Sequence, residues 1–223
     1  RFLSLVESND ENVQHILNHY HARDGSSTLS LVEFPGVLLP SFQSTLRALQ
    51  NMKDTGYLPF SEFLAPTDPN MSGPVDVPPP AYALKPGFSF SLRCLTKDEV
   101  DLEFRPGKPF DIREFQEHSI LDDAQAVALV NTLQRKIGLI QGPPGTGKSF
   151  TGVALIKVLL ENKTRADIGP VICVCYTNHA LDQLLEDLLE KKITSRIIRI
   201  GSQSKSEKLE PFNLKVVARD AEK

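Results

Sequence analysis

The stretch that most constrains this chain runs from residue 142 to residue 149 and reads Gly-Pro-Pro-Gly-Thr-Gly-Lys-Ser. A short apolar run, residues 137–141, precedes it, and an apolar segment with a helical pattern, residues 150–160, follows it. A glycine-rich turn between a strand and a helix is the context in which Gly-x-x-x-x-Gly-Lys-Ser forms a phosphate-binding loop. A plain surface turn is the alternative, but it would not require these residues in register between these flanks. The sequence therefore predicts a site for a nucleotide phosphate.

The chemistry of this loop follows from its residue types. Glycines let successive backbone N–H groups curl around an anion, and the amino terminus of the following helix adds its positive dipole end. Lys148 can reach the β- and γ-phosphates, and the Ser149 hydroxyl can ligate Mg²⁺, so we expect these two as catalytic residues. The expected nucleotide contacts are the loop residues and the one after them: Gly142, Pro143, Pro144, Gly145, Thr146, Gly147, Lys148, Ser149 and Phe150.

From residue 121 onward, apolar runs of strand length alternate with helical patterns. The expected strands are residues 137–141, 171–175 and 196–200, and the expected helices are residues 122–135, 149–162 and 179–192. Such a β-α-β-α-β series is typical of an α/β fold with a parallel sheet and flanking helices, which binds ligands at the carboxyl ends of its strands. We therefore predict a P-loop domain over residues 121–223.

The first 120 residues have a different character. We predict a helical region over residues 1–65, with a helix from about Pro40 to Lys53, and a linker over residues 66–80 that contains six prolines. Two period-two runs, residues 88–94 and 100–104, flank a polar turn and indicate a half-exposed β-hairpin. Residues 81–120 are therefore expected to form a small β element or stalk.

Charge is unevenly distributed along the chain. Residues 1–120 carry ten basic and sixteen acidic side chains, whereas residues 121–223 carry fifteen basic and twelve acidic ones. The more basic half is the one with the phosphate loop, which suits contact with a polyanion. There is no apolar run of about 20 residues to span a membrane, and three cysteines give no even disulfide framework. We expect a cytoplasmic protein, with the nucleus as the alternative location, and no membrane partner.

Two further stretches narrow the class of nucleotide protein. Gln125 lies on the helix that leads into the first expected strand, and its amide could pair with the edge of adenine and favour ATP. An exposed helix glutamine is the alternative. After the second expected strand, Thr177 and Asn178 open a helix and could present hydroxyl, amide and backbone N–H groups to a phosphate. The alternative is that Asn178 only caps that helix.

Four ordered stretches resemble signatures of superfamily-1 helicases. Residues 121–125 are similar to the Q motif, 142–149 to motif I, 177–182 to motif Ia, and 198–201 to the Arg-x-Gly strand that follows. The resemblance is closest to the up-frameshift-type RNA helicases, and among them to the large RNA-silencing helicases that carry zinc fingers. The specific motifs cover residues 121–201, and the resemblance is weaker over residues 1–120.

The resemblance implies a fold, ligands and roles. Residues 121–223 would belong to the first RecA-like domain of a helicase core, and residues 81–110 to its small β-rich accessory domain or stalk. Gln125 would read the adenine of ATP, and Ser149 would hold Mg²⁺. Thr177, Asn178 and His179 would contact a single strand of nucleic acid, with RNA preferred over DNA.

Two alternatives to an ATP-dependent RNA helicase remain open. A hexameric-ring P-loop ATPase also uses Gly-Pro-Pro-Gly-Thr-Gly-Lys, but it has no use for a Thr-Asn pair after the second strand. A helicase-derived, non-catalytic RNA-binding scaffold is the other. No Asp-Glu motif of the Walker B type occurs after Lys148. We therefore expect these residues to be part of a longer protein, to bind nucleotide weakly and not to turn it over measurably.

Overall fold

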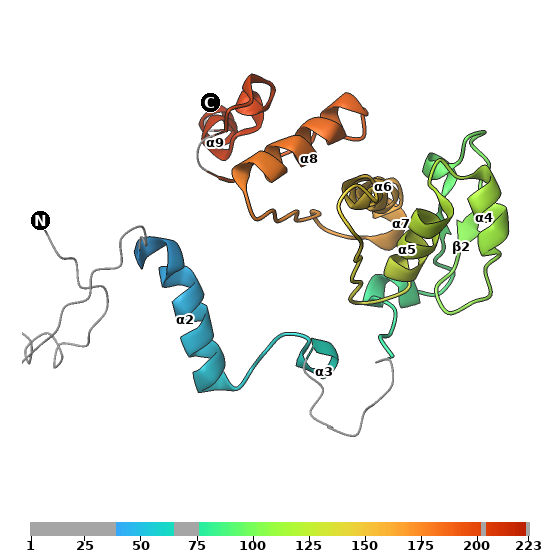
Figure 1. The fold of residues 1–223 in the computed structure, drawn as a ribbon, viewed down its shortest axis with the longest axis horizontal. Helices are drawn as coiled ribbons and strands as arrows, with labels where there is room; N and C mark the ends of the chain where they lie inside the picture. Colours follow the sequence, from blue (N-terminus) through green and yellow to red (C-terminus); the bar gives the residue numbers. More distant parts are fainter. Residues whose placement is uncertain (1–38, 65–75, 202–203, 222–223) are drawn as a thin grey trace, which may run out of the picture. The chain divides into compact units, whose positions relative to one another are not determined.

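The computed structural model describes residues 39–64, 76–201 and 204–221 (Figure 1). The chain divides into two compact units, residues 1–67 and residues 68–223. The predictions for residues 1–38 and for the proline-rich residues 66–75 lie outside the described residues.

In the first unit, the structure describes helix α2, Leu39–Thr55, and the short helix α3, Ser61–Leu64. The helix predicted from residue 40 is confirmed. It ends before Gly56, whose φ of 62° lies in the left-handed region that favours glycine after a helix. The side chains of Leu46 and Leu49, which share one face of α2, are about half exposed at 48% and 55%. In the described part of this unit, that apolar face is therefore not covered.

In the described residues of the second unit, the regular structure is mainly helical, with one small antiparallel sheet (Figure 1). Three 3₁₀ helices and two strands accompany six α-helices in the described residues. In chain order the elements are η1 Ala81–Leu84, β1 Phe90–Ser91, η2 Arg93–Leu95, β2 Glu103–Phe104, α4 Ile112–His118, α5 Asp123–Leu133, α6 Lys148–Glu161, α7 Lys163–Ala166, α8 Asn178–Glu190, η3 Glu207–Phe212 and α9 Leu214–Ala221.

The predicted hairpin is confirmed, although it is short. Strands β1 and β2 pair antiparallel with Phe90 opposite Phe104, and Leu92 N–H donates to the Leu102 carbonyl at 2.9 Å. The 3₁₀ helix η2 interrupts the first period-two run one residue after β1. Phe90 and Phe104 are fully buried, and their stacked rings have centroids 6.1 Å apart. The apolar face of the hairpin therefore lies in the core.

One hydrophobic core joins this hairpin to the helices that flank the phosphate loop. It contains Leu129 and Leu133 of α5 and Ala154 and Val158 of α6, together with the buried phenylalanines of residues 88–115. A second, smaller core lies between α6, α8 and η3 and includes Val153, Leu185, Leu188 and Leu209. Helix α6, which begins at the phosphate loop, therefore contributes to both cores.

Asn162 ties the carboxyl end of α6 to strand β1. Its side chain is buried, with 1% of the residue exposed. Its Oδ1 accepts from the Ser91 N–H at 2.8 Å, and its Nδ2 donates to the carbonyls of Ser91 and Val158 at 2.9 and 2.8 Å. Every polar atom of this buried amide is thus engaged, which is the condition for burying it without a large cost.

We expect Asn162→Ala to destabilise the chain by about 2–3 kcal/mol, because it strands backbone groups that have lost their partner. Urea unfolding followed by circular dichroism measures this change. Ser91→Ala is the matched control. It removes an exposed hydroxyl bonded to Asp101 but keeps the backbone groups that Asn162 binds, so its effect should stay within about 0.5 kcal/mol. Equal losses in the two variants would contradict the role assigned to Asn162.

The parallel sheet predicted from the apolar runs is not present among the described residues. Residues 137–141 and 171–175 have no regular secondary structure, and of residues 196–200 only Arg199 forms an isolated parallel bridge, to Asn213. Strands of a parallel sheet are buried on both faces. Here five side chains of these runs stay exposed, from 57% to 88%: Leu139, Ile172, Val174, Ile198 and Ile200. The runs are apolar enough for strands, but without hydrogen-bonded neighbours their pattern alone does not make a sheet.

Candidate nucleotide site and the amino terminus of helix α8

The phosphate loop has the backbone that its glycines predict. Gly145 and Gly147 have φ angles of 84° and 75°, in the left-handed region, and Gly147 is the residue that precedes helix α6. Alternation of left-handed residues with ordinary ones turns successive N–H groups toward one side, and the first turn of a helix adds N–H groups without helical partners. The loop therefore suits an anion such as a triphosphate.

Lys148 lies across this loop. Its Nζ donates to the carbonyls of Gly142 and Pro143 at 2.7 and 2.8 Å. The Thr146 hydroxyl donates to the same Pro143 carbonyl at 2.9 Å. Lys148 and Ser149 are exposed, so neither is shielded from a ligand in solution. An ammonium group held at the mouth of an N–H-lined loop is complementary to the β- and γ-phosphates of a nucleotide.

Gln125 lies against the loop, although it precedes Gly142, the first residue of the loop, by 17 positions in the sequence. Its Nε2 donates to the Thr146 carbonyl at 3.5 Å, and a Cβ on Gly147 would collide with the same nitrogen. The Gln125 Oε1 accepts from the Asp122 N–H at 3.3 Å as part of a capping box at the start of α5. The capping box orients the amide, and its nitrogen faces the loop.

This orientation allows a test of the predicted contact between Gln125 and adenine. We expect Gln125→Glu to weaken ATP binding by about tenfold, because glutamate removes the nitrogen donor and adds a negative charge beside the phosphates. Glutamate is also accepted at this position of a capping box, so the melting temperature should not fall. Titration with fluorescent ATP and GTP analogues measures the effect. A loss that is equal for both nucleotides would show that Gln125 does not read the base.

Phe150 is placed differently from its neighbours in the loop. Its ring is half-buried and packs against the first core, and Lys191 Nζ lies 5.3 Å from the ring centroid. Because Phe150 lies in the first turn of α6, its backbone N–H has no hydrogen-bond partner within the helix and is the group of Phe150 that can bind an anion.

The amino terminus of α8 is capped by Thr177. Its hydroxyl accepts from the Ala180 N–H at 3.1 Å, so Thr177, and not Asn178, is the capping residue. Asn178 is the first residue of the helix, and its side chain and that of His179 are exposed. The alternative in which Asn178 caps the helix is therefore wrong. The Thr177 hydroxyl accepts the hydrogen bond that the Asn178 side-chain oxygen would have accepted, and Thr177 precedes Asn178 by one residue.

Beneath this terminus lies a buried ion pair that the sequence analysis did not single out. Arg199 Nε donates to Asp182 Oδ1 at 2.6 Å, with the two side chains 0% and 11% exposed. The Ser204 hydroxyl donates to Asp182 Oδ2 at 2.9 Å. Burial acts to raise the pKa of Asp182, but the hydrogen bonds from Arg199 and Ser204 and the charge of Arg199 outweigh it, so this pKa lies below its usual value. In the sequence, the feature that could have indicated this ion pair is the Arg-x-Gly stretch, in which Arg199 interrupts an apolar run.

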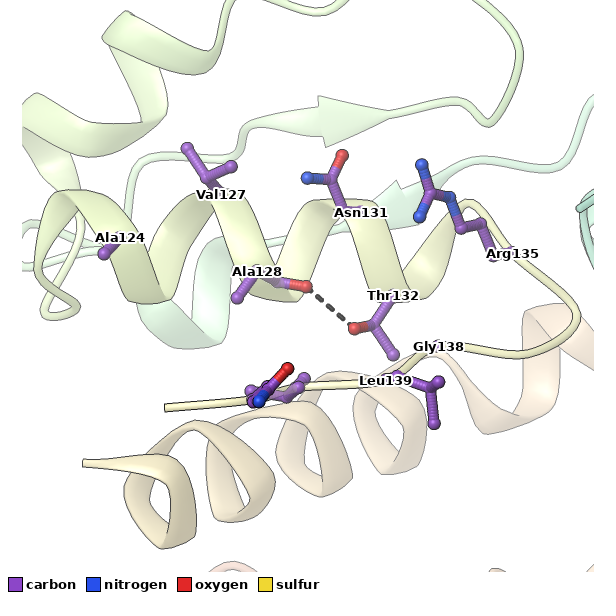
Figure 2. A pocket seen from close by; sticks show the side chains of 10 residues that line it. Ala124, Val127, Ala128, Asn131, Thr132, Arg135, Gly138 and Leu139 are labelled. Atoms are coloured by element: carbon purple, nitrogen blue, oxygen red, sulfur yellow. Dashed lines mark hydrogen bonds between the residues drawn. The ribbon is translucent and has the colours of Figure 1, made fainter. Parts of the chain in front are cut away.

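A groove of about 280 Å³ runs between α5 and the segment that leads into the phosphate loop (Figure 2). Its walls include Val127 and Leu139, which are 39% and 87% exposed. At its floor, Gly138 approaches Thr132 so closely that a Cβ would lie 2.7 Å from the Thr132 methyl carbon. Figure 2 shows the Thr132 hydroxyl bonded to the Ala128 carbonyl. None of the predicted nucleotide contacts lines this groove. Gln141, which does line it, directly precedes the phosphate loop.

Two features are absent from the residues that the structure describes. No helix in that part of the chain is long and apolar enough to cross a membrane. Nor do three or more His, Cys, Asp or Glu residues gather there in a group that could hold a metal ion.

The loop, Gln125 beside it and the capped helix α8 form an arrangement that suits a bound phosphate group. Residues 120–222 match the family of AAA domains. Among curated proteins, NFX1-type zinc finger-containing protein 1 of Homo sapiens is 46% identical over 99 residues, which are 43% of this chain and 5% of that protein. The helicase required for RNAi-mediated heterochromatin assembly 1 of Schizosaccharomyces pombe is 42% identical over 98 residues, 44% of this chain and 9% of that protein.

A third relative belongs to the up-frameshift group. The putative regulator of nonsense transcripts 1 of Takifugu rubripes is 36% identical over 85 residues, 38% of this chain and 7% of that protein. This chain thus spans less than a tenth of the length of these relatives. No solved structure matched. The resemblance to superfamily-1 helicases, and to the zinc-finger-bearing and RNA-silencing proteins among them, is confirmed in the region of the AAA domain.

Proposed function

We propose that this chain is the ATP-binding part of an ATP-dependent RNA helicase. The observation that carries this proposal is that residues 125 and 142–149, far apart in the sequence, meet at one loop. That loop combines left-handed glycines, the amino terminus of a 14-residue helix and the ammonium group of Lys148. The helicase names of several relatives support the same reading.

In this proposal the residues of the loop bind the triphosphate. The backbone N–H groups of residues 145–150 contact its oxygens, and Lys148 exchanges its carbonyl partners for the β- and γ-phosphates. Gln125 would pair with adenine, and Ser149 would be the protein ligand of Mg²⁺. Mg²⁺ held there would supply positive charge that neutralises the charge developing in phosphoryl transfer. Loop residues 142–144 would shape the cradle, because their prolines restrict the backbone between the glycines.

The nucleic acid would lie at the amino terminus of α8. Thr177, Asn178 and His179 are exposed there, and the helix directs its positive dipole end toward a phosphate. We propose a single strand of RNA as the partner, because one matched relative is named as a putative ATP-dependent RNA helicase and another as a helicase required for RNAi-mediated heterochromatin assembly. Contacts to a backbone carry no base sequence information, so we expect binding without strong sequence preference.

Three measurements on the 223-residue chain test this function. Fluorescence titration with an ATP analogue in Mg²⁺ should show saturable binding, and an ATPase assay should show no measurable turnover. A competition between single-stranded RNA and DNA of one sequence, at a stated salt concentration, should favour RNA. A clear preference for DNA would contradict the RNA assignment. Binding of ATP without any binding of either strand would favour the ring-type ATPase, and binding of RNA without ATP would favour a scaffold.

A further inference from the structure

The buried guanidinium of Arg199 contacts more than its ion-pair partner. Besides Asp182, Arg199 Nη2 donates to Asn178 Oδ1 at 3.2 Å, and Nη1 donates to the Gly201 carbonyl at 3.2 Å and to Asn213 Oδ1 at 3.5 Å. Asn178 and Asp182 lie four residues apart, on one face of α8. One rigid planar group thus holds the amino-terminal part of that helix at two points, Asn178 and Asp182.

This contact decides which way the amide of Asn178 points. A guanidinium has only donors, so the side-chain atom of Asn178 that faces it must be the oxygen. The amide nitrogen, a donor, is then directed away from Arg199, and Asn178 is exposed. Among the described residues this nitrogen makes no hydrogen bond. The result is an oriented, available donor beside the free N–H groups at the start of α8.

The spacing of Arg199 and Gly201 is part of the same arrangement. A Cβ on Gly201 would lie 2.9 Å from Asn178 Oδ1 and 3.3 Å from Arg199 Nη1. Any side chain at this position would push the Asn178 amide away from the guanidinium. The Arg-x-Gly pattern therefore has a physical reason, because arginine supplies the donors and glycine leaves room for the amide they bind.

We propose that Arg199 is a positioning residue, which turns the amide nitrogen of Asn178 outward so that it can donate to the phosphate backbone of a single strand. The inference rests on the proposed function, because it concerns the same contact at the amino terminus of α8. The inference adds Arg199, which does not touch the nucleic acid, and it assigns the side-chain nitrogen of Asn178 as the donor atom. It also makes Gly201 necessary for that orientation.

Asn178→Asp tests the assignment of the donor. Aspartate has the same shape and keeps, with added charge, the contact to Arg199, but it replaces the outward nitrogen with a negatively charged acceptor. Asn213→Asp is the matched control. Asn213 also accepts a hydrogen bond from Arg199 with its Oδ1, and its substitution adds the same charge at a site outside α8. Binding of fluorescein-labelled oligouridylate is measured by anisotropy at one fixed salt concentration.

We expect Asn178→Asp to weaken binding by at least about tenfold, the scale of one lost hydrogen bond to a charged group, and Asn213→Asp by less than about threefold. Gly201→Ala, which displaces the amide but adds no charge, should also weaken binding by about three- to tenfold. Titration with the fluorescent ATP analogue should give unchanged affinities, which separates a positioning role from general loss of structure. Thermal melting of each variant checks the fold.

The outcomes separate this inference from the function on which it rests. Wild-type binding with an unchanged Asn178→Asp variant would overturn the inference and leave the proposed function intact. Equal losses in Asn178→Asp and Asn213→Asp would also overturn it, because the effect would then come from charge alone. If Asn178→Asp melted early, Asn178→Ala would replace it, and unaltered binding by that variant would have the same meaning. Failure of the wild-type chain to bind oligouridylate would overturn the proposed RNA contact and this inference with it.

Discussion

Lys148→Ala should weaken ATP binding by about 10- to 100-fold and leave the fold intact. The expected loss corresponds to one charge-assisted hydrogen bond to a phosphate oxygen, worth about 1.5–3 kcal/mol. In the structure the Nζ of Lys148 is already held over the loop by the carbonyls of Gly142 and Pro143. Little side-chain ordering is therefore needed when a phosphate arrives.

The measurement is a titration with a fluorescent ATP analogue in Mg²⁺. Lys108→Ala is the control, because it removes the same charge from an exposed turn elsewhere in the same unit. It should change ATP affinity by less than about twofold if the effect at position 148 is local. Urea unfolding should show that Lys148→Ala stays within about 1 kcal/mol of the wild type, since its hydrogen bonds are exposed. Equal affinities of Lys148→Ala and the wild type would contradict the phosphate site.

The largest loss of stability is expected from Arg199→Ala. Removal of one partner of a buried ion pair leaves the other charge without compensation, which costs about 3–5 kcal/mol. Here that partner is Asp182, whose side chain is 11% exposed. Asn178 and Asn213 would lose a donor in the same variant. The free energy of unfolding in urea measures the change.

A second ion pair in the chain provides a control of matched geometry. Arg93 and Glu99 also lie 2.6 Å apart, but their side chains are 56% and 76% exposed. Arg93→Ala should therefore cost no more than about 1 kcal/mol. The double variant Arg199→Met with Asp182→Leu should recover much of the loss, because neither charge remains in the core. Similar costs for Arg199→Ala and Arg93→Ala would show that burial does not set the contribution of the pair.

The contribution of the buried pair should also depend on pH. The pKa of Asp182 is lower in the folded chain than in the unfolded one, where it is about 3.9. Its stabilising contribution is thus fully present above that unfolded value and is lost as the pH falls through the folded pKa. We expect the difference in unfolding free energy between the wild type and Arg199→Ala to shrink from pH 7 to below pH 4. A difference that grows on acidification would contradict this sign.

The sequence by itself determined the features that depend on neighbours along the chain. The glycine turn within residues 142–149, a helix that begins near residue 122 and an antiparallel hairpin between residues 88–94 and 100–104 were all predicted and are present. Caps, glycine turns and apolar periodicity act over a few residues, so their signal is complete within a short window. Even there a detail was misplaced, because the cap of α8 is Thr177 and not its neighbour Asn178.

Only the tertiary structure decided which distant residues meet. It placed Gln125 against Gly147 and buried Arg199 between Asp182 and Asn178, which no local pattern could reveal. It also left the apolar runs 137–141 and 171–175 unpaired, although their composition is that of buried strands. The physical reason is the same in each case. A strand needs hydrogen-bonding neighbours and a buried charge needs a partner, and both come from parts of the chain that sequence periodicity does not connect.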